Sequence, residues 1–390
     1  MKSAEFFLLI SILMVFYTYI GYGVIVLIFN RLLNKNKVTH ELDENQEFPT
    51  LTLLVAAYNE QDCIEEKILN SLSLDYPKDL IKFLFITDGS TDNTNQIIKN
   101  YPNIILLFEN GRGGKIAATK RAMEYVDTDI VVFSDANTSV NSDALLKIIR
   151  HYTNPKVGGV ACEKKVRVLK ADSASGAGEG FYWRYESFLK QQDSNFYSVV
   201  GAAGELFSIR TELFEPIPSD SIIEDFYMTM KIAEKGYIIK YEPQAYAIEE
   251  PSFSVSEEYK RKTRIAAGGI QSIFRLSGLL NPLKLPALTF LYISHRVLRW
   301  SLTPLLLLVI IILSVLLAVK GSFFGQILLL SQILFYALAL VGYVLRHKKV
   351  KAKIFYIPFY FTFMNYAVYV GAMRYFSGNQ SVVWEKSKRA

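Results

Sequence analysis

Cysteine and histidine are scarce in this sequence, with 2 cysteines and 4 histidines among 390 residues. The cysteines, Cys63 and Cys162, are too few and too far apart in the chain to form a disulfide framework or a zinc site. The histidines have no metal-ligand spacing either. These absences argue against a disulfide-rich secreted protein and against a zinc enzyme. Two reduced cysteines fit a cytoplasmic setting.

Two further patterns are missing. No glycine-rich loop ends in Lys-Ser or Lys-Thr, which disfavours a P-loop ATPase. The basic residues, which give a net charge of +6, cluster beside apolar runs, as at Arg31, Lys35 and Lys37 and again over residues 346–353. Such clusters usually mark the cytoplasmic side of membrane segments, so no nucleic-acid partner is expected.

Long apolar runs lie at the two ends of the chain. Phe6–Phe29 is long enough to cross a bilayer of roughly 30 Å, exceeds a signal-peptide core and has no small-residue cleavage site. We therefore expect a retained anchor over residues 1–34. Leu302–Val319 and Phe323–Leu345, joined by a short turn, predict a transmembrane hairpin over residues 301–346.

Two other apolar stretches carry polar groups. Leu288–Trp300 contains His295, Arg296 and Arg299, which are costly in hydrocarbon, so residues 256–300 are expected to form amphipathic helices at the membrane interface. Residues 354–376 either span the membrane or form a re-entrant or interfacial segment. Asn365, many tyrosines and the basic tail favour the second alternative, which keeps residues 377–390 inside.

The middle of the chain, residues 48–255, alternates short apolar runs with helix-like stretches. The runs are Leu51–Ala57, Ile81–Thr87, Asn103–Phe108 and Asp129–Ser134, and the helix candidates lie near residues 62–72, 91–100 and 115–125. This alternation predicts an α/β domain with a mainly parallel sheet covered on both faces. Ligands of such sheets bind at the carboxyl ends of the strands.

Polar and glycine residues follow each of the four predicted strands. They are Ala57-Tyr58-Asn59-Glu60, Asp88-Gly89-Ser90-Thr91-Asp92, Gly111-Arg112-Gly113-Gly114-Lys115 and Asp135-Ala136-Asn137. Each string alone is equally well explained as an ordinary turn or helix cap. Four strings at successive strand ends point instead to one binding edge.

The chemistry of a nucleotide diphosphate explains this combination. A divalent cation such as Mg²⁺ or Mn²⁺, held by Asp135, would neutralise the leaving diphosphate. Lys115 and the loop amides before it can approach the phosphates. Asp88 can accept hydrogen bonds from the base or ribose, and Tyr58 can pack on the base.

Seven strings in order resemble membrane-bound family 2 glycosyltransferases of the GT-A fold. They are VAAYNE, FITDGSTDNT, GRGGK, FSDANT, GAAGELFSIR, IIEDF and YKRKTRIAAGG, and they cover roughly residues 50–275. The resemblance implies nucleotide-sugar contacts at Ala57, Tyr58, Glu60, Asp88, Lys115 and Asp135. It also implies that Asp135 and Asn137 form the DxD-type metal element, although an amide can bind metal only through its carbonyl oxygen.

The resemblance further implies that Asp225 is the general base and that transfer inverts the anomeric centre. Without the other motifs, Glu224-Asp225 would be interpreted as a pair of acidic residues at a helix N-terminus, where the helix dipole stabilises negative charge. Gly204, Glu205 and Glu224 resemble the acceptor side. Arg261 and Arg264 fall where synthases of this family carry Gln-x-x-Arg-Trp, with Ile265 in place of the tryptophan. The alternative for these arginines is a basic helix on anionic lipid. The segment around Trp384 loosely resembles a gating segment.

The leading hypothesis is therefore an inverting, metal-dependent transferase in a membrane, with its catalytic domain in the cytoplasm. A UDP-sugar donor and a glycan or lipid-linked acceptor are expected, and a bacterial inner membrane is the expected setting from the family's distribution. Polymer extension and single-sugar transfer both remain open, because the missing tryptophan weakens the case for long products. The competing class is a non-catalytic membrane scaffold that retains the fold.

Overall fold

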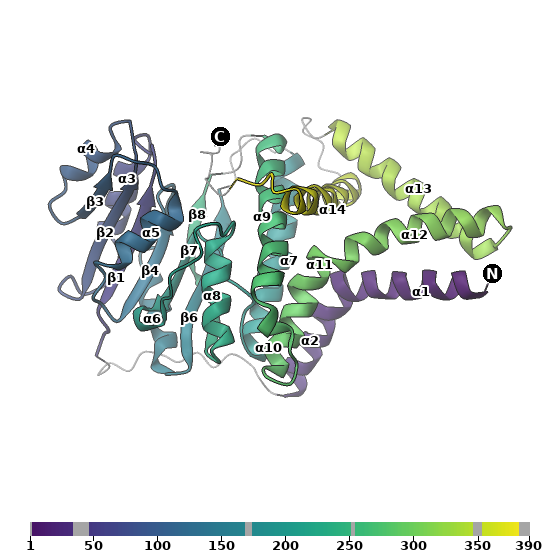
Figure 1. Cartoon of the computed structure of the whole chain (residues 1–390), viewed down its shortest axis with the longest axis horizontal. Coiled ribbons are helices and arrows are strands. Elements are labelled where there is room, and N and C mark those ends of the chain that lie inside the picture. The colour runs from purple at the N-terminus through teal and green to yellow at the C-terminus, as the bar shows by residue number, and fades with distance from the viewer. Residues whose placement is uncertain (1, 34–46, 168–173, 251–253, 346–352, 382–390) are drawn as a thin grey trace.

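The structure is a computed structural model that describes residues 2–33, 47–167, 174–250, 254–345 and 353–381 (Figure 1). The basic run at residues 346–352 and the end of the tail, including Trp384, lie outside the described residues.

The described part of the chain is built around one eight-stranded sheet with the order β3-β2-β1-β4-β7-β6-β8-β5 (Figure 1). The strands are β1 (Leu51–Ala57), β2 (Ile81–Asp88), β3 (Ile105–Glu109), β4 (Ile130–Asp135), β5 (Thr138–Val140), β6 (Val157–Val166), β7 (Leu206–Arg210) and β8 (Ile238–Glu249). The first four are parallel neighbours, whereas β7 is antiparallel to β4 and β6. The four strands predicted from the sequence are confirmed to within two residues at each end.

Side-chain alternation along the strands creates two separate cores. Leu53, Val55 and Phe85 face a core with α3 (Ile64–Leu72), α4 (Thr94–Lys99) and α6 (Ala144–Ile149). Leu54 and Phe133 face the other core, which contains α5 (Lys115–Met123) and α8 (Glu224–Glu234). The sheet is thus covered on both faces, as a mainly parallel sheet requires.

The second core extends into the helices that lead to the apolar ends. Tyr22 and Val26 of α2 (Tyr22–Leu32), Leu189 of α7 (Ala174–Phe196) and Leu288 of α10 (Pro286–Tyr292) are buried in it. Figure 1 shows these helices beside the sheet, between it and the projecting apolar helices. One face of the α/β domain is therefore packed directly against the helical part of the molecule.

Three helical stretches of the described chain are long and apolar enough to cross a membrane. They are Lys2–Leu32, α12 (Leu302–Val319) and α13 (Phe323–Val344). The first combines α1 (Lys2–Phe16), a π-helical turn at Tyr17–Gly21 and α2, with a bend between α1 and α2 (Figure 1). Figure 1 shows α1, α12 and α13 extending from the same side of the domain.

Helix α14 (Lys353–Phe376) is not among these three. It packs on α9 (Val255–Arg275) and α13, and it runs nearly along the line of sight in Figure 1, across the direction of α1 and α12. Asn365 within it accepts a hydrogen bond from the Tyr19 hydroxyl at 2.8 Å. The hydroxyls of Tyr17 and Ser294 form a similar link at 2.7 Å.

The charges of Leu288–Trp300 have a different environment from the one expected. His295, in the π-helical turn Ile293–Val297, is fully buried, with Nδ1 2.5 Å from Asp193 Oδ2. Glu186 pairs with Arg296 at 2.5 Å and with Arg299, on α11 (Leu298–Trp300), at 3.3 Å. These side chains were expected to face the membrane interface. They instead pair with carboxylates of α7, which compensates their burial within the protein.

Candidate active site

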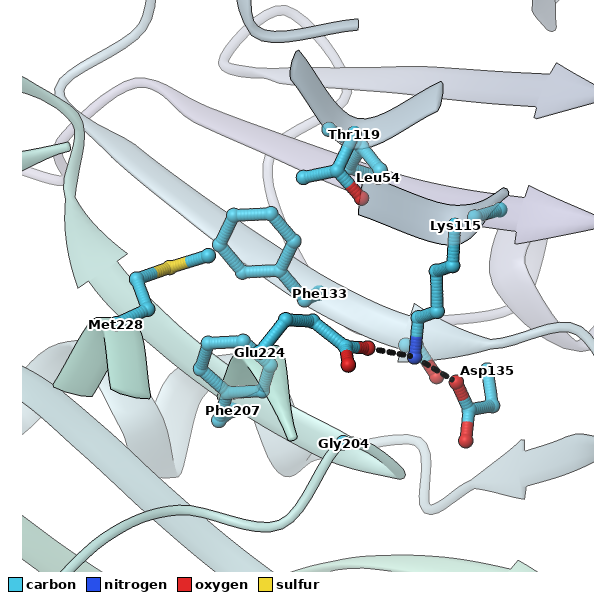
Figure 2. A pocket seen from close by; sticks show the side chains of 11 residues that line it. Leu54, Lys115, Thr119, Phe133, Asp135, Gly204, Phe207, Glu224 and Met228 are labelled. Atoms are coloured by element: carbon cyan, nitrogen blue, oxygen red, sulfur yellow. Dashed lines mark hydrogen bonds and ion pairs between the residues drawn. The ribbon is translucent and has the colours of Figure 1, made fainter. Parts of the chain in front are cut away.

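Side chains from three elements meet at the carboxyl edge of the sheet (Figure 2). Lys115 begins α5, Asp135 ends β4, and Glu224 and Asp225 form the first turn of α8. Lys115 Nζ lies 2.8 Å from Asp135 Oδ1 and 3.1 Å from Glu224 Oε1. The structure therefore brings together four of the residues singled out in the sequence.

An apolar floor supports this cluster. Leu54, Phe133, Phe207 and Met228 line a cavity of about 20 Å³ beneath Lys115 (Figure 2). That space suits about one water molecule rather than a sugar. The Lys115 stem is thus held on an apolar surface while its ammonium group reaches the carboxylates.

The two adjacent carboxylates of α8 have opposite protonation preferences. Burial and the Glu224 charge raise the pKa of Asp225 to about 7, although Lys115 counteracts them. Burial also acts on Glu224, but Lys115 and Arg264 outweigh it and lower the pKa of Glu224. Burial opposes the charge of Lys115, yet Asp135 and Glu224 raise its pKa. Asp225 is therefore the carboxylate suited to accept a proton near neutral pH.

Gly204 lies directly against this cluster. A Cβ atom there would lie 3.3 Å from Asp225 Oδ2 and 3.4 Å from Lys115 Nζ. Gly201, at a φ of 83°, packs so tightly on Phe226 that a Cβ would come within 2.1 Å of its ring. The glycines of this loop thus keep the space beside Asp225 free of side chains.

Glu205, predicted on the acceptor side, belongs to a neighbouring ion-pair group. It pairs with Lys164, which also pairs with Glu249. Burial opposes ionisation of Glu205, but Lys164 and Arg261 lower its pKa. Arg261 lies 3.4 Å from Glu249. Arg261 and Glu205 are therefore close to each other, and the Glu205 charge also contributes to the raised pKa of Asp225.

Arg264 lies nearer to the cluster of Lys115, Asp135, Glu224 and Asp225. Its Nη2 donates to the Ile222 carbonyl at 3.0 Å, just before α8 begins. Burial lowers its pKa, and the charges of Glu224, Asp225 and Asp135 act against that change. Arg264 is thus placed to add positive charge beside the carboxylates.

Asp88 holds the loop that precedes Lys115. It accepts hydrogen bonds from the amides of Gly113 at 3.1 Å and Gly114 at 2.5 Å, and from Arg121 at 3.3 Å. The described contacts therefore give Asp88 a positioning role, and its nucleotide contact stays a prediction.

Tyr58, Glu60 and Ala57 lie together where β1 ends. The Arg112 guanidinium lies 3.9 Å from the centre of the Tyr58 ring, so it covers one face of the ring that is expected to pack on a base. The Glu60 amide donates to Thr94 Oγ1 at 2.9 Å, and Ala57 is buried. Their contacts with a nucleotide also remain predictions.

Asp135 ends β4, and Asn137 lies in the turn between β4 and β5. Burial raises the pKa of Asp135, with Lys115 opposing and Glu205 adding to the rise. No group of three or more His, Cys, Asp or Glu side chains in the described residues has a metal-binding arrangement. One carboxylate and one amide oxygen still fit Mg²⁺ or Mn²⁺, which in such sites takes further ligands from substrate phosphates and water.

Lys67 was missed from the sequence although it lies directly behind the site. Its buried Nζ donates to Ser134 Oγ at 2.6 Å and to the Thr138 carbonyl at 2.9 Å. Burial lowers its pKa to about 7, with Asp135 opposing. A signal was present, because Lys67 shares a helical face with the apolar Ile64 and Ile68.

Residues 52–217 match the model of the family described as glycosyl transferase family 2. The chain carries a family 2 glycosyltransferase domain. Five of the seven strings lie within the matched residues, which include Lys115, Asp135 and Gly204, and the resemblance is confirmed for them. The strings IIEDF, which contains Asp225, and YKRKTRIAAGG follow the matched residues.

Relatives of this glycosyltransferase domain include poly-beta-1,6-N-acetyl-D-glucosamine synthases. One from Staphylococcus aureus is 30% identical over 241 residues, which are 59% of this chain and 57% of the relative. Another from Staphylococcus epidermidis is 28% identical over 258 residues, 63% and 60% of the two chains. The alignments thus span less than two thirds of these relatives.

A solved glycosyltransferase has the same fold over almost the whole chain. It is a mannosyltransferase from Pyrobaculum calidifontis in complex with GDP-Man and Mn²⁺, with a TM-score of 0.74 and 22% identity. The match covers 96% of this chain and 100% of that one. The predicted GT-A fold with flanking apolar helices is confirmed.

Proposed function

We propose that this chain is an inverting, metal-dependent glycosyltransferase that uses a nucleotide sugar, most simply a UDP-sugar. The acceptor is a growing polysaccharide or a lipid-linked glycan at the cytoplasmic face of a membrane. The observation that carries this proposal is the position of Asp225 beside Gly204 and next to the Lys115–Asp135 pair. It places a proton acceptor next to groups suited to a diphosphate.

Each residue has a defined part in the transfer. Asp225 takes the proton of the acceptor hydroxyl while that oxygen attacks the anomeric carbon. The bond from this carbon to the diphosphate oxygen breaks, and attack from the opposite side inverts the configuration. Lys115 and Arg264 balance the negative charge on the leaving diphosphate. Asp135 and Asn137 would hold a divalent cation, which supplies further charge neutralisation when bound.

The membrane placement belongs to the same proposal. Residues 1–34 form an anchor, residues 301–346 a hairpin, and residues 48–255 a cytoplasmic domain, in a bacterial inner membrane. Residues 256–300 join them near the interface. The orientation of α14 across α1 and α12 supports an interfacial rather than a spanning segment for residues 354–376 (Figure 1). Cytoplasmic positions for both basic segments follow from this arrangement.

The length of the product separates two versions of this function. The names of the staphylococcal relatives favour a polymer, with N-acetylglucosamine as the first donor sugar to test. Ile265, at the position of the synthase tryptophan, favours a single transfer. Gel or mass analysis of the products distinguishes them, because a ladder of long products contradicts single transfer.

Nucleotide release from a panel of nucleotide sugars, with Mn²⁺ or with a chelator, tests the function directly. We expect release with one donor that requires the metal and is lost in Asp225→Asn. Asp127→Asn is a matched control, because Asp127 is exposed and pairs only with Lys82 among its described ion pairs. Absence of release with every donor would support the non-catalytic scaffold.

A further inference from the structure

A second, larger cavity lies away from the catalytic cluster. Its volume is about 670 Å³, which is within the range of ligand-binding pockets. Six aromatic rings line it, contributed by Tyr259, Tyr336, Tyr343, Phe359, Phe363 and Tyr366. Hydroxyl groups come from four of these rings, from Thr362, and from Ser254 and Ser256 at the start of α9, and none of the lining residues that the structure describes is charged. This lining suits an apolar chain and not a nucleotide or a diphosphate.

Helix α9 separates this cavity from the catalytic cluster. On one side, Arg264 bonds to the Ile222 carbonyl and Gly268 packs on Ile223, next to α8. On the other side, the Tyr259 ring stacks on Tyr366 of α14, with ring centres 5.8 Å apart. Gly371 of α14 also packs on this second side, against Ala266. An occupant of the cavity is therefore on the wrong side of α9 to reach Asp225.

The cavity also reaches the outer surface of α13. Leu340 and Tyr343 line it, yet their side chains are 64% and 46% exposed. The same helix exposes Ile333 and Leu334, and it is one of the helices apolar enough to span a membrane. The lining is thus continuous with the apolar surface that a bilayer would cover.

We propose that the cavity between α9, α13 and α14 binds one acyl chain of a membrane phospholipid that enters from the bilayer beside α13. The headgroup lies near the hydroxyls of Ser254 and Ser256. This site rests on the membrane placement given under the proposed function, but it does not depend on sugar transfer. A lipid held there supports α9 from the side opposite Arg264.

Photo-crosslinking in a defined bilayer tests the site. The full chain is reconstituted in vesicles of phosphatidylethanolamine and phosphatidylglycerol that contain a phospholipid with a mid-chain diazirine. Mass spectrometry then maps the adducts. We expect adducts to concentrate on the cavity rings of α13 and α14 rather than to spread evenly over α1 and α12.

Two substitutions fill the cavity from opposite walls, Ala339→Trp on α13 and Thr362→Trp on α14. Each should reduce labelling of Phe359 and Phe363 by about tenfold, which corresponds to ~1.4 kcal/mol of binding free energy. Ile333→Trp, on the exposed surface of α13, is the matched control and should leave labelling unchanged. Melting temperatures identify a variant that fails to fold, and the other variant then decides the test.

Two results would overturn the lipid site. One is labelling that is unchanged in both filled variants. The other is displacement of the adducts by a soluble oligosaccharide, which would make the cavity a glycan path. Asp225→Asn should label like the wild type. Loss of turnover with intact labelling in an otherwise folded protein therefore counts against the transferase mechanism alone, and the reverse result counts against the lipid site alone.

Discussion

Two charge clusters in this molecule, one partly exposed and one buried, combine carboxylates with basic side chains but are balanced differently. The edge cluster consists of Lys115, Asp135, Glu224 and Asp225. The bridge cluster joins Glu186 and Asp193 of α7 to His295, Arg296 and Arg299. The first lies at the carboxyl edge of the sheet, and the second lies between the catalytic domain and the projecting helices.

The edge cluster has more negative than positive groups. Three carboxylates surround Lys115, and Arg264 lies beside them. As a result, Asp225 has a raised pKa, because its charge is poorly compensated. In the bridge cluster, Glu186 contacts a histidine and two arginines. Although burial opposes it, these contacts hold the pKa of Glu186 well below its ordinary range.

This difference is the one expected between a proposed catalytic site and a cluster that maintains the fold. Uncompensated carboxylates are costly in the absence of a ligand, and they become favourable when a cation and a proton donor arrive. Buried ion pairs in which each charge has an opposite partner lose much stability when one partner is removed. Substitutions in the two clusters should therefore change different measured quantities.

The largest effect is expected from Asp225→Asn. An amide cannot accept the acceptor proton, so turnover should fall ~10²–10⁴-fold. Folding should not suffer, because the raised pKa of Asp225 means that its ionisation destabilises the native state, increasingly from its ordinary pKa of 3.8 upward and fully above about 7. At pH 8 the variant should therefore melt at or above the wild-type temperature. A marked loss of stability in this variant would show that Asp225 maintains the fold, and would contradict its proposed role as the general base.

Glu186→Gln should have the opposite effects, a loss of stability with little change in turnover. It leaves Arg296, Arg299 and His295 without their shared carboxylate, and the free energy of unfolding should fall by roughly 3–5 kcal/mol. Folded protein should retain its turnover. In the wild type, the contribution of Glu186 is complete above its ordinary pKa of 4.5 and is lost as the pH falls below it. Thermal melts from about pH 2 to about pH 8 measure both effects.

A pH profile sharpens the comparison within the edge cluster. Because Asp225 must be ionised and its pKa is raised to about 7, kcat/KM should fall about tenfold per unit of pH below that value. Glu224→Gln removes a charge that raises this pKa, so the acidic limb should move to lower pH. If the acidic limb of the kcat/KM profile stays at the same pH in Glu224→Gln, the group that titrates is not Asp225.

Gly204→Ala should have the smallest effect. Its methyl group would lie against the ends of Asp225 and Lys115, where these two flexible side chains can give way slightly. We expect turnover to fall about tenfold through misplacement of the reacting groups, with an unchanged melting temperature. Gly111→Ala is the control, since a Cβ there would meet no atom within 4 Å. Equal losses in both variants would refute a specific role for Gly204.

The edge cluster was accessible from the sequence because its members follow strands or begin helices. Lys115 and Asp135 come directly after turn and strand signals, and Glu224-Asp225 begins a helix with two acidic residues. Parallel strands place such ends at one edge regardless of the details of packing. The four strands and the binding edge were predictable for the same reason.

The bridge cluster was not accessible in this way. His295 and Asp193 are 102 residues apart, and nothing local indicates that they meet. When the carboxylates of α7 are not known to lie nearby, the apolar stretch at residues 288–300 with its three basic side chains resembles an interfacial helix. Lys164 and Glu205 were missed as a pair for the same reason, since a buried ion pair depends on the three-dimensional arrangement of β6 and β7.

The tyrosine links of the first helix have a consequence for the order of events during synthesis. Tyr19 leaves the ribosome early, but its partner Asn365 follows 346 residues later. At roughly 5–20 residues per second this interval is about 17–70 s. Throughout it, the anchor enters the bilayer with a hydroxyl group that has not yet met its final acceptor. Completion of the last helix, and not insertion of the first, is therefore the step that fixes the anchor to the finished enzyme.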